Sequence, residues 1–223
     1  MSSPNHTIEV YQDLYLTCPE NGDSALPVIL QSHVRPPWRH ALEAEERMAT
    51  AAGPDTERYT VLEREVAEGV PAARLVLYRD AGTYYKIANI VPTECQSLGE
   101  TGYNDVLNDF VTRVAKPAQR EGLSFELTKR WQTMTDWTSK EAADALHLFS
   151  VMANKATGSS HPMDAERWRN FLIADHRAEG SLSSHNLHRW LVEVEHWPFE
   201  EAKDLVNERD TAVELLQHYD HCD

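Results

Sequence analysis

The 223-residue sequence predicts an α+β fold: a mostly antiparallel five-stranded sheet with packed helices, followed by a four-helix carboxyl-terminal half. Three observations predict it. Short segments in which apolar and polar residues alternate dominate the first 130 residues. Beyond residue 138 the apolar residues recur only at the helical spacing of three to four. The connector over 129–137 is too short and too rich in Trp to be a flexible linker.

These observations divide the chain into a sheet domain over 1–130 and a helical domain over 131–223 that we expect to pack against it. The hydrophobic content of 41% is sufficient for a real core. No apolar run approaches the roughly 20 residues that a membrane-spanning helix needs. The amino terminus also lacks the basic and apolar regions of a signal peptide. We therefore expect a cytoplasmic protein.

The first three elements are predicted to be a strand and two helices. Residues 7–17 alternate like a half-buried strand, with Ile8 and Leu14 on its inner side. A short helix is predicted from Ser24 to the break at Pro36-Pro37. A second helix is predicted over 38–52 and ends at Gly53-Pro54. Its inner face is predicted from four residues: Trp38, Leu42, Ala49 and Ala52.

Three strands are then predicted over 59–68, 72–79 and 83–91, the last two joined in a hairpin across Asp80-Ala81-Gly82. The stretch from Leu75 to Tyr78 is apolar on both faces, which is typical of a central strand.

A helix and a strand complete the predicted sheet domain. An apolar stripe predicts a helix that begins near Tyr103 and ends at Gly122, and a strand follows over 123–128.

Four helices are predicted in the second half. The first follows a capping box, Thr138-Ser139-Lys140-Glu141, and the second runs from Pro162 to about Arg177. Ser183 or Ser184 starts the third, and Pro198 starts the fourth. Trp168 and Trp190 fit the core stripes, and Tyr219 is expected at the inner face of the last helix.

The net charge of −15 argues against nucleic-acid binding, since that affinity comes largely from Lys and Arg. From Glu193 to the end, ten Asp or Glu stand against two Lys or Arg, a net of −8. This final segment predicts a surface that docks a basic protein partner, and a purely solubilising role is the alternative.

The densest group of hydrogen-bonding side chains lies between the first two predicted helices of the second half. Gly158 is surrounded by Lys155, Thr157, Ser159, Ser160 and His161, and the next helix carries Asp164 and Arg167. A helix start exposes unpaired N–H groups, so this loop is a candidate binding site for a phosphate or carboxylate. The alternative is structural, with Ser160 or His161 capping the helix and Gly158 ending the one before.

Histidine and tryptophan are two further residue types that could bind a ligand or contact a partner. Eight of the eleven His lie between His147 and His221, but the pair His185-x-x-His188 has no fixed third ligand, so no metal is predicted. Trp131 and Trp137 follow no helical period and are predicted to seal the two halves together or to contact a partner.

No set of residues has the pattern of a known catalytic site, and no cofactor is predicted. Cys18, Cys95 and Cys222 are expected to be free thiols, because they are odd in number and widely spaced.

One stretch does bear on an enzyme family. The third predicted helix of the sheet domain is preceded by Gln96-Ser97-Leu98-Gly99-Glu100-Thr101-Gly102. The order of elements through residue 128 resembles the first part of the GNAT acyltransferase fold, which binds the coenzyme A pyrophosphate at this place through a Gln/Arg-x-x-Gly-x-Gly/Ala loop. Here the loop is one residue longer and has Glu100 where a phosphate would lie, and helices replace the family's last two strands.

We therefore predict an acidic interaction protein, such as an inhibitor, an immunity-type factor or a complex subunit, that binds a protein partner through its helical half. The alternative is an enzyme or small-ligand binder that uses the Lys155 to Arg167 loop, including an acyltransferase of the GNAT type.

Overall fold

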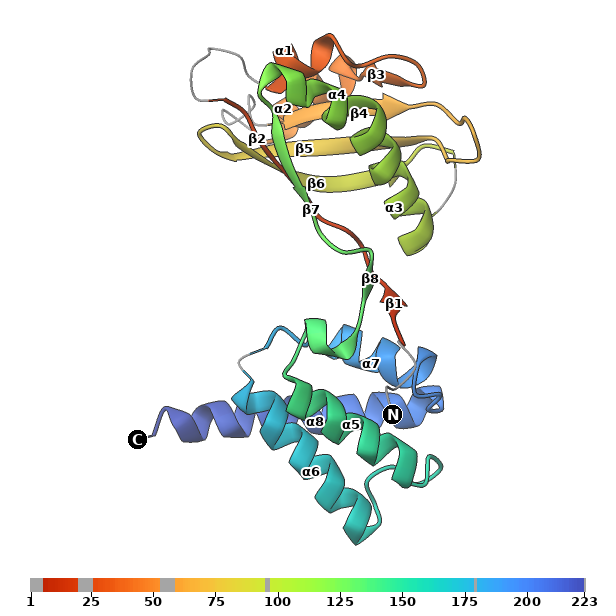
Figure 1. Ribbon diagram of the computed structural model, residues 1–223, viewed down its shortest axis with the longest axis vertical. Coiled ribbons are helices and arrows are strands. Elements are labelled where there is room, and N and C mark those ends of the chain that lie inside the picture. Colours follow the sequence, from red (N-terminus) through yellow and green to blue (C-terminus); the bar gives the residue numbers. More distant parts are fainter. Residues whose placement is uncertain (1–5, 20–25, 53–58, 95–96, 179, 223) are drawn as a thin grey trace. The chain divides into compact units, whose positions relative to one another are not determined.

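The computed structural model describes residues 6–19, 26–52, 59–94, 97–178 and 180–222. The chain forms two compact units (Figure 1). Glu9–Arg130 is the sheet unit, and Trp131–Asp223 together with the amino-terminal Met1–Ile8 is the helical unit.

The sheet unit is built on a six-stranded antiparallel sheet in the order β3-β4-β5-β6-β2-β7. The strands are β2 (Leu14–Thr17), β3 (Trp38–His40), β4 (Tyr59–Arg64), β5 (Ala73–Ala81), β6 (Tyr84–Pro92) and β7 (Ser124–Leu127). The predicted α+β class and antiparallel sheet are confirmed. The predicted number of five strands is wrong by one, because β3 was expected to be helical.

The strand predicted over 7–17 is two short strands. β1 (Ile8–Glu9) pairs with β8 (Trp131–Gln132), whereas β2 lies inside the large sheet between β6 and β7. The residues between β1 and β2 leave the ladder because their polar groups have other partners. The backbone N–H of Gln12 donates to Asn104 Oδ1 (2.9 Å), and its buried side chain donates to the carbonyl of Thr128 (2.6 Å).

Residues 38–40 pair with β4 instead of starting a helix. The Trp38 side chain is buried in the sheet core, and its indole N–H donates to Asp109 Oδ2 (2.8 Å). The helix α2 (Leu42–Ala52) begins only after this strand, and Leu42 is exposed instead of facing inward. The predicted helix start at Ser24, the Gly53-Pro54 end and the side chains of Ala49 and Ala52 lie outside the described residues; the helix α1 is seen over Leu26–Gln31.

The sheet contains the predicted central strand and a β5–β6 hairpin near the predicted position. β5 lies between β4 and β6, so its predicted central position is confirmed. The hairpin turn is Gly82-Thr83, shorter than predicted, and Gly82 has the positive φ of 52° that favours glycine there.

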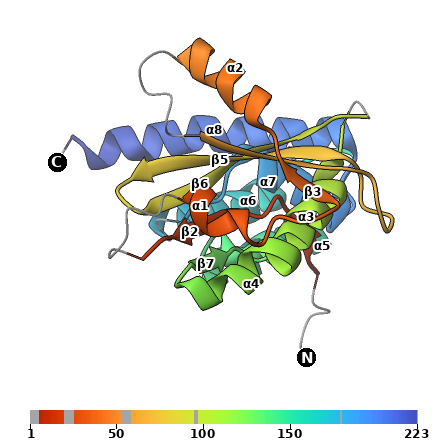
Figure 2. The same ribbon diagram turned by 90° about the horizontal axis from the view of Figure 1, so that it is seen from above.

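One helical segment follows the sheet's longest hairpin. It comprises α3 (Gly99–Phe110), a π-helical turn (Val111–Ala115), α4 (Lys116–Ala118) and a 3-10 turn (Gln119–Glu121), and it ends at Gly122 with φ of 90°. Its apolar stripe is buried as predicted, including Val106 and Phe110. In Figure 2, α1, α3 and α4 cover one face of the sheet and α2 lies over the other, which agrees with the two separate apolar clusters in this unit.

The helical unit contains a 3-10 turn (Met134–Asp136) and four helices, α5 (Lys140–Met152), α6 (Pro162–Arg177), α7 (Ser184–Glu193) and α8 (Phe199–Asp220). The four predicted helices are confirmed. The predicted capping box at Thr138 is wrong, because Ser139 caps α5 through the N–H of Ala142, and Thr138 instead donates to Asp175 (2.8 Å).

An aromatic cluster forms the core of the helical unit. Phe149 stacks on Trp197 at 5.2 Å between ring centroids and contacts Trp168 at 5.0 Å. Trp137 meets Trp190 edge-on at 6.0 Å. These large rings are buried, so the prediction that Trp168 on α6 and Trp190 on α7 face the core is confirmed. None of the helices in the described part of the chain is long and apolar enough to cross a membrane.

Candidate functional site

The outward face of α8 carries an acidic stripe. Glu200, Asp204 and Glu208 are exposed and lie four residues apart, which places them on one side of the helix. Within the described residues, none of the three forms an ion pair with a basic side chain; Glu208 accepts a hydrogen bond from the Ser159 hydroxyl (2.8 Å). We call these three residues the acidic stripe. Its negative charge is open to a partner.

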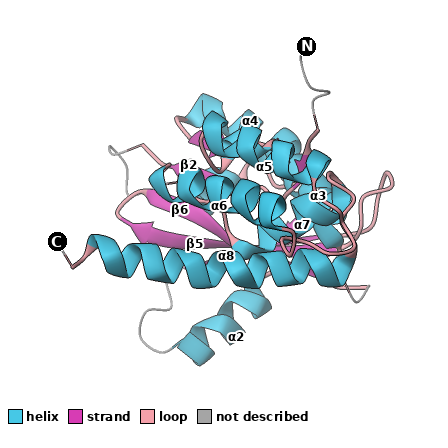
Figure 3. Cartoon of the chain, turned by 90° about the horizontal axis from the view of Figure 1, so that it is seen from below, coloured by secondary structure: helices cyan, strands magenta, loops and turns pink. Residues whose placement is uncertain are grey.

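The same face of α8 becomes apolar toward its carboxyl end. Leu215 is 68% exposed and Tyr219 is 66% exposed, and they continue the stripe at helical spacing after Glu208 and Thr211. Tyr219 was predicted to lie in the core, and this prediction is wrong. The last turns of α8 lie at one end of the helical unit (Figures 1 and 3), and the Tyr219 side chain there is exposed and borders a groove instead of packing into the core.

A groove of about 890 Å³ lies between the carboxyl-terminal halves of α6 and α8. Its apolar lining comes from Ile173 on α6, Leu182 in the following loop, and Val213, Leu216 and Tyr219 on α8. Because Tyr219 belongs both to the outward face and to the groove, the two surfaces are continuous.

Most charged groups that line the groove are paired with each other. Arg209 donates to Asp175 Oδ2 from both Nη2 (2.9 Å) and Nε (3.1 Å), and His176 Nε2 lies 2.6 Å from Asp220 Oδ2. Arg177 is exposed and has no ion-pair partner among the described residues. Among the described residues, the groove therefore offers apolar surface and one cation, Arg177, without an ion-pair partner.

The Lys155 to Arg167 loop is held largely by its own bonds. The Lys155 ammonium donates to the carbonyl of Glu195 and lies 5.8 Å from the centre of the Trp197 ring. Gly158 has φ of 57°, and its N–H donates to the carbonyl of Asn154 (3.1 Å). Lys155 is thus directed to the loop before α8, away from the other candidate residues.

The first turn of α6 has its N–H groups satisfied. Pro162 has none, Met163 N donates to His161 Nδ1 (3.3 Å), and Asp164 N donates to the His161 carbonyl (2.9 Å). The helix cap is therefore His161. Arg167 Nη1 donates to the buried Asp164 carboxylate (2.7 Å). These bonds reduce the number of donors that a bound anion would find at this helix start.

Five of the predicted loop residues nevertheless border one open pocket of about 600 Å³. They are Thr157, Ser160, His161, Asp164 and Arg167. Lys155 and Ser159 are not part of its lining, since they bond to Glu195 and Glu208. The two exposed side chains of Met152 and Met163 make much of the rest of the lining apolar.

The two tryptophans singled out in the connector lie in different environments. Trp137 is buried in the helical core beside Trp190, whereas Trp131 on β8 is 54% exposed. Trp131 is therefore the member of the pair that presents a ring to solvent.

Histidines and cysteines form no metal-binding arrangement in the described part of the chain, where no three His, Cys, Asp or Glu side chains are grouped for a metal ion. Cys18 and Cys222 are free thiols, and burial raises the pKa of Cys18 to about 11. Cys95 lies outside the described residues.

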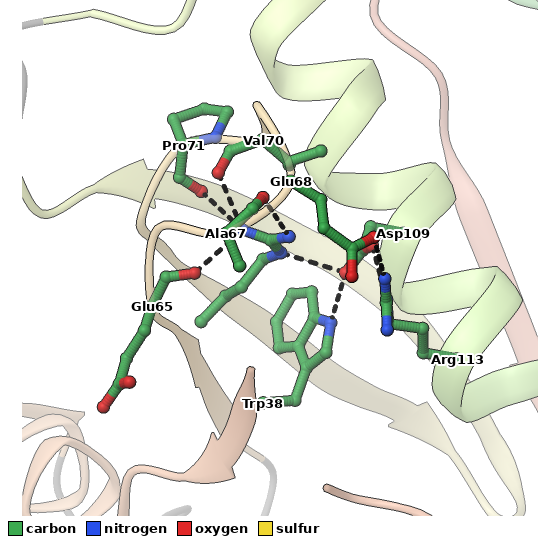
Figure 4. A network of polar contacts seen from close by, with 9 residues as sticks. Trp38, Glu65, Ala67, Glu68, Val70, Pro71, Asp109 and Arg113 are labelled. Carbon is green, nitrogen blue, oxygen red and sulfur yellow. Dashed lines mark hydrogen bonds and ion pairs between the residues drawn. The ribbon is translucent and has the colours of Figure 1, made fainter. Parts of the chain in front are cut away.

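The sheet unit contains a buried polar network that no sequence pattern predicts (Figure 4). The Arg64 side chain is fully buried. It donates from Nε to Asp109 Oδ2 (2.9 Å), from Nη1 to the carbonyls of Glu65 (2.8 Å) and Val70 (2.7 Å), and from Nη2 to that of Ala67 (3.0 Å). The guanidinium thus fastens the 65–71 loop to α3.

The carboxylate of Asp109 receives further donors from Trp38 and Arg113. Burial alone would raise the pKa of Asp109, but the hydrogen bonds from Arg64, Arg113 and Trp38 outweigh it and hold the pKa below its ordinary value. Every member of the network has a partner inside the unit, so we assign it a structural role.

A second carboxylate, Glu9, is held in the same way. It accepts hydrogen bonds from Arg130 Nε (2.7 Å), Asn104 (3.1 Å) and Thr101 (2.6 Å). Burial opposes its ionisation, yet these donors lower the pKa of Glu9. Glu9 therefore connects the start of the sheet unit to α3 and to Arg130, the residue before β8.

The stretch compared with the coenzyme A loop begins α3 at Gly99 and places Glu100 in the first helical turn. A carboxylate there occupies the end of the helix that attracts anions. Gln96 lies outside the described residues. Comparisons of the chain with protein-family models, curated proteins and solved structures gave no match.

Proposed function

We propose that this protein is an interaction protein whose helical unit binds a basic segment of a protein partner through the outward face of α8. The observation that carries the proposal is the acidic stripe of Glu200, Asp204 and Glu208, whose carboxylates have no basic partner within the described residues. Open charges of one sign raise the rate of association with a partner of opposite charge. An inhibitor, an immunity-type factor or a complex subunit would use such a surface.

Charge reversal tests this proposal. In one variant, Glu200, Asp204 and Glu208 are replaced by Lys; in the control, three exposed acids of the sheet unit, Glu43, Glu46 and Glu126, are replaced by Lys. Both variants change the net charge from −15 to −9, so they differ only in where the charge is removed.

The full-length proteins are immobilised and exposed to a cell lysate at about 50 mM salt, and the retained proteins are identified. We expect the wild type and the control to retain the same basic proteins, the α8 variant to lose them, and about 1 M salt to release them, because the screening length falls to about 3 Å. Equal retention by the α8 variant and the control would contradict the proposal.

A second candidate is a small-ligand site in the pocket bordered by Thr157, Ser160 and His161, and the five predicted residues in its lining favour it. Ser160→Ala and Thr157→Val remove hydroxyl groups and leave the Arg167–Asp164 pair intact. If a small ligand binds there, these variants weaken its binding while the melting temperature stays the same. Loss of binding in the α8 variant alone would exclude the pocket.

A further inference from the structure

The groove between α6 and α8 has the features of an anchor site beside a charged docking surface. Its walls present Ile173, Val213 and Leu216, and Tyr219 links it to the outward face of α8. In most interfaces a few apolar side chains that enter such a pocket contribute most of the binding energy, while surrounding charges steer the approach.

The charges around the groove decide which kind of partner fits. The acidic stripe of α8 is open, but Asp175 and Asp220 inside the groove are already paired with Arg209 and His176. Arg177, which is exposed and unpaired within the described residues, would repel a basic group placed at the groove itself. A complementary partner thus carries its basic groups over Glu200 to Glu208 and an apolar group over the groove.

The length of α8 sets the length of that partner segment. From Glu200 to Tyr219 the helix advances nineteen positions, or about 28 Å at 1.5 Å per residue. A helical partner segment therefore needs about 19 residues to cover both surfaces, and an extended one about nine.

We infer that the α6–α8 groove receives one or more large apolar side chains at the end of a basic partner segment, whose Lys or Arg residues lie along the acidic stripe. This inference rests on the proposed function and adds to it the place of the anchor and its chemistry. A second copy of this chain fits less well, because its own α8 presents the same acidic stripe and would be repelled.

Two synthetic peptides of about 20 residues test the inference. Both carry the same Lys and Arg residues in one half; the other half has Leu and Phe in the first peptide and Ala at the same positions in the second. Binding to the full chain is measured by fluorescence anisotropy at about 50 and 150 mM salt. We expect the Leu/Phe peptide to bind at least tenfold more tightly than the Ala peptide.

The groove is then altered by Ile173→Gln and Tyr219→Gln, both at exposed positions where the fold tolerates a polar side chain. The preference for the Leu/Phe peptide should fall below about threefold, while the affinity for the Ala peptide stays the same. Leu148→Gln, on the exposed side of α5, is the matched control and should keep the preference.

Each other outcome is informative. A preference that survives in the Ile173→Gln/Tyr219→Gln protein would overturn the anchor site. Equal, salt-sensitive binding of both peptides would also overturn it but leave the proposed electrostatic function standing. Absence of binding by either peptide would contradict both. Light scattering that shows a dimer, dissociated by the groove substitutions, would assign the groove to a second copy and overturn the inference.

Discussion

Two regions of this protein, the Arg64 network of the sheet unit and the outward face of α8 in the helical unit, use charged side chains in opposite ways. In the sheet unit, the Arg64 guanidinium is buried and donates hydrogen bonds to Asp109 and to four backbone carbonyls. On α8, the three carboxylates of the acidic stripe are exposed and have no basic partner within the described residues. A charge that is satisfied inside the fold stabilises that fold, whereas a charge left open is free to act on another molecule. From this contrast we assign a structural role to the Arg64 network and propose recognition for the outward face of α8.

The largest expected effect is at Arg64. Arg64→Met removes five donated hydrogen bonds and leaves Asp109 and the 65–71 loop without their common partner. We expect a loss of about 3–5 kcal/mol in the stability of the sheet unit, since breaking one side of a buried ion pair strands the other. Hydrogen exchange measured by mass spectrometry would show it as faster exchange in β4, β5 and α3.

Arg74→Met is the matched control, because Arg74 forms an ion pair with Glu63 that is partly open to solvent. It should cost no more than about 1 kcal/mol. If Arg64→Met were as mild as Arg74→Met, the structural role assigned to the network would be wrong.

A smaller effect is expected at Gly180, in the helical unit. A Cβ atom at this position would lie 2.3 Å from the carbonyl oxygen of Trp137, so Gly180→Ala forces the backbone apart and should cost about 1–3 kcal/mol. At Gly158 an added Cβ meets nothing within 4 Å, and only the positive φ opposes it, at about 1 kcal/mol. Thermal melts should show a larger drop in melting temperature for Gly180→Ala than for Gly158→Ala. The reverse ranking would contradict a close approach between residue 180 and the Trp137 carbonyl.

The next effect is the response of the sheet unit to acid. The folded pKa of Asp109 lies below its ordinary value of about 3.8. The unfolded chain therefore binds a proton at a higher pH than the folded one, and the stability from Asp109 is present above pH 4 and is lost as the pH falls through the folded pKa. Asp109→Asn should be less stable at neutral pH and should lose less stability below pH 4.

The signal for this titration is a ¹⁹F-labelled Trp38, the single Trp of residues 9–130, which contacts Asp109 directly. An unchanged acid transition in Asp109→Asn would show that other carboxylates, such as Glu9, dominate the acid response of the unit.

The smallest effect on stability is expected on α8. Glu200→Lys places a cation in the first turn of α8 and should cost up to about 1 kcal/mol. Leu215→Gln, Asp204→Lys and Glu208→Lys alter exposed groups and should each change the stability by less than about 0.5 kcal/mol. Their effect should appear in binding alone. A drop of several degrees in the melting temperature would mean that this face supports the fold, which would remove the contrast between the two units.

The elements that follow a simple period were predictable from sequence. β5, β6 and the helices α5 to α8 have clear apolar periodicity, and they lie close to where the pattern places them. Serine caps, Ser139 and Ser183, also mark the starts of α5 and α7. The structure departs where long-range partners override local preference. Residues 38–40 form a strand because they pair with β4, and Trp38 is fixed by Asp109, which is 71 positions away.

The buried Arg64 network could not be predicted from the sequence, whereas the acidic charge of α8 could. Nothing near Arg64 in the sequence indicates that it is buried, because its carboxylate partner is 45 residues away. The acid excess of the final segment is visible from composition alone. The position of Tyr219 is not, because an apolar period predicts which side of a helix faces inward but not how far the neighbouring helices extend along it. The groove lies between the carboxyl-terminal halves of α6 and α8, so no pattern within one helix predicts it.

The most direct test of the contrast between the units is a backbone NMR titration of the full chain with the basic Leu/Phe peptide. We expect shift changes along α8 from Glu200 to Tyr219 and at Ile173 on α6, with the amides of β4, β5 and β6 unchanged. Shift changes that cluster on the sheet unit, with α8 unaffected, would contradict the assignment of recognition to the helical unit.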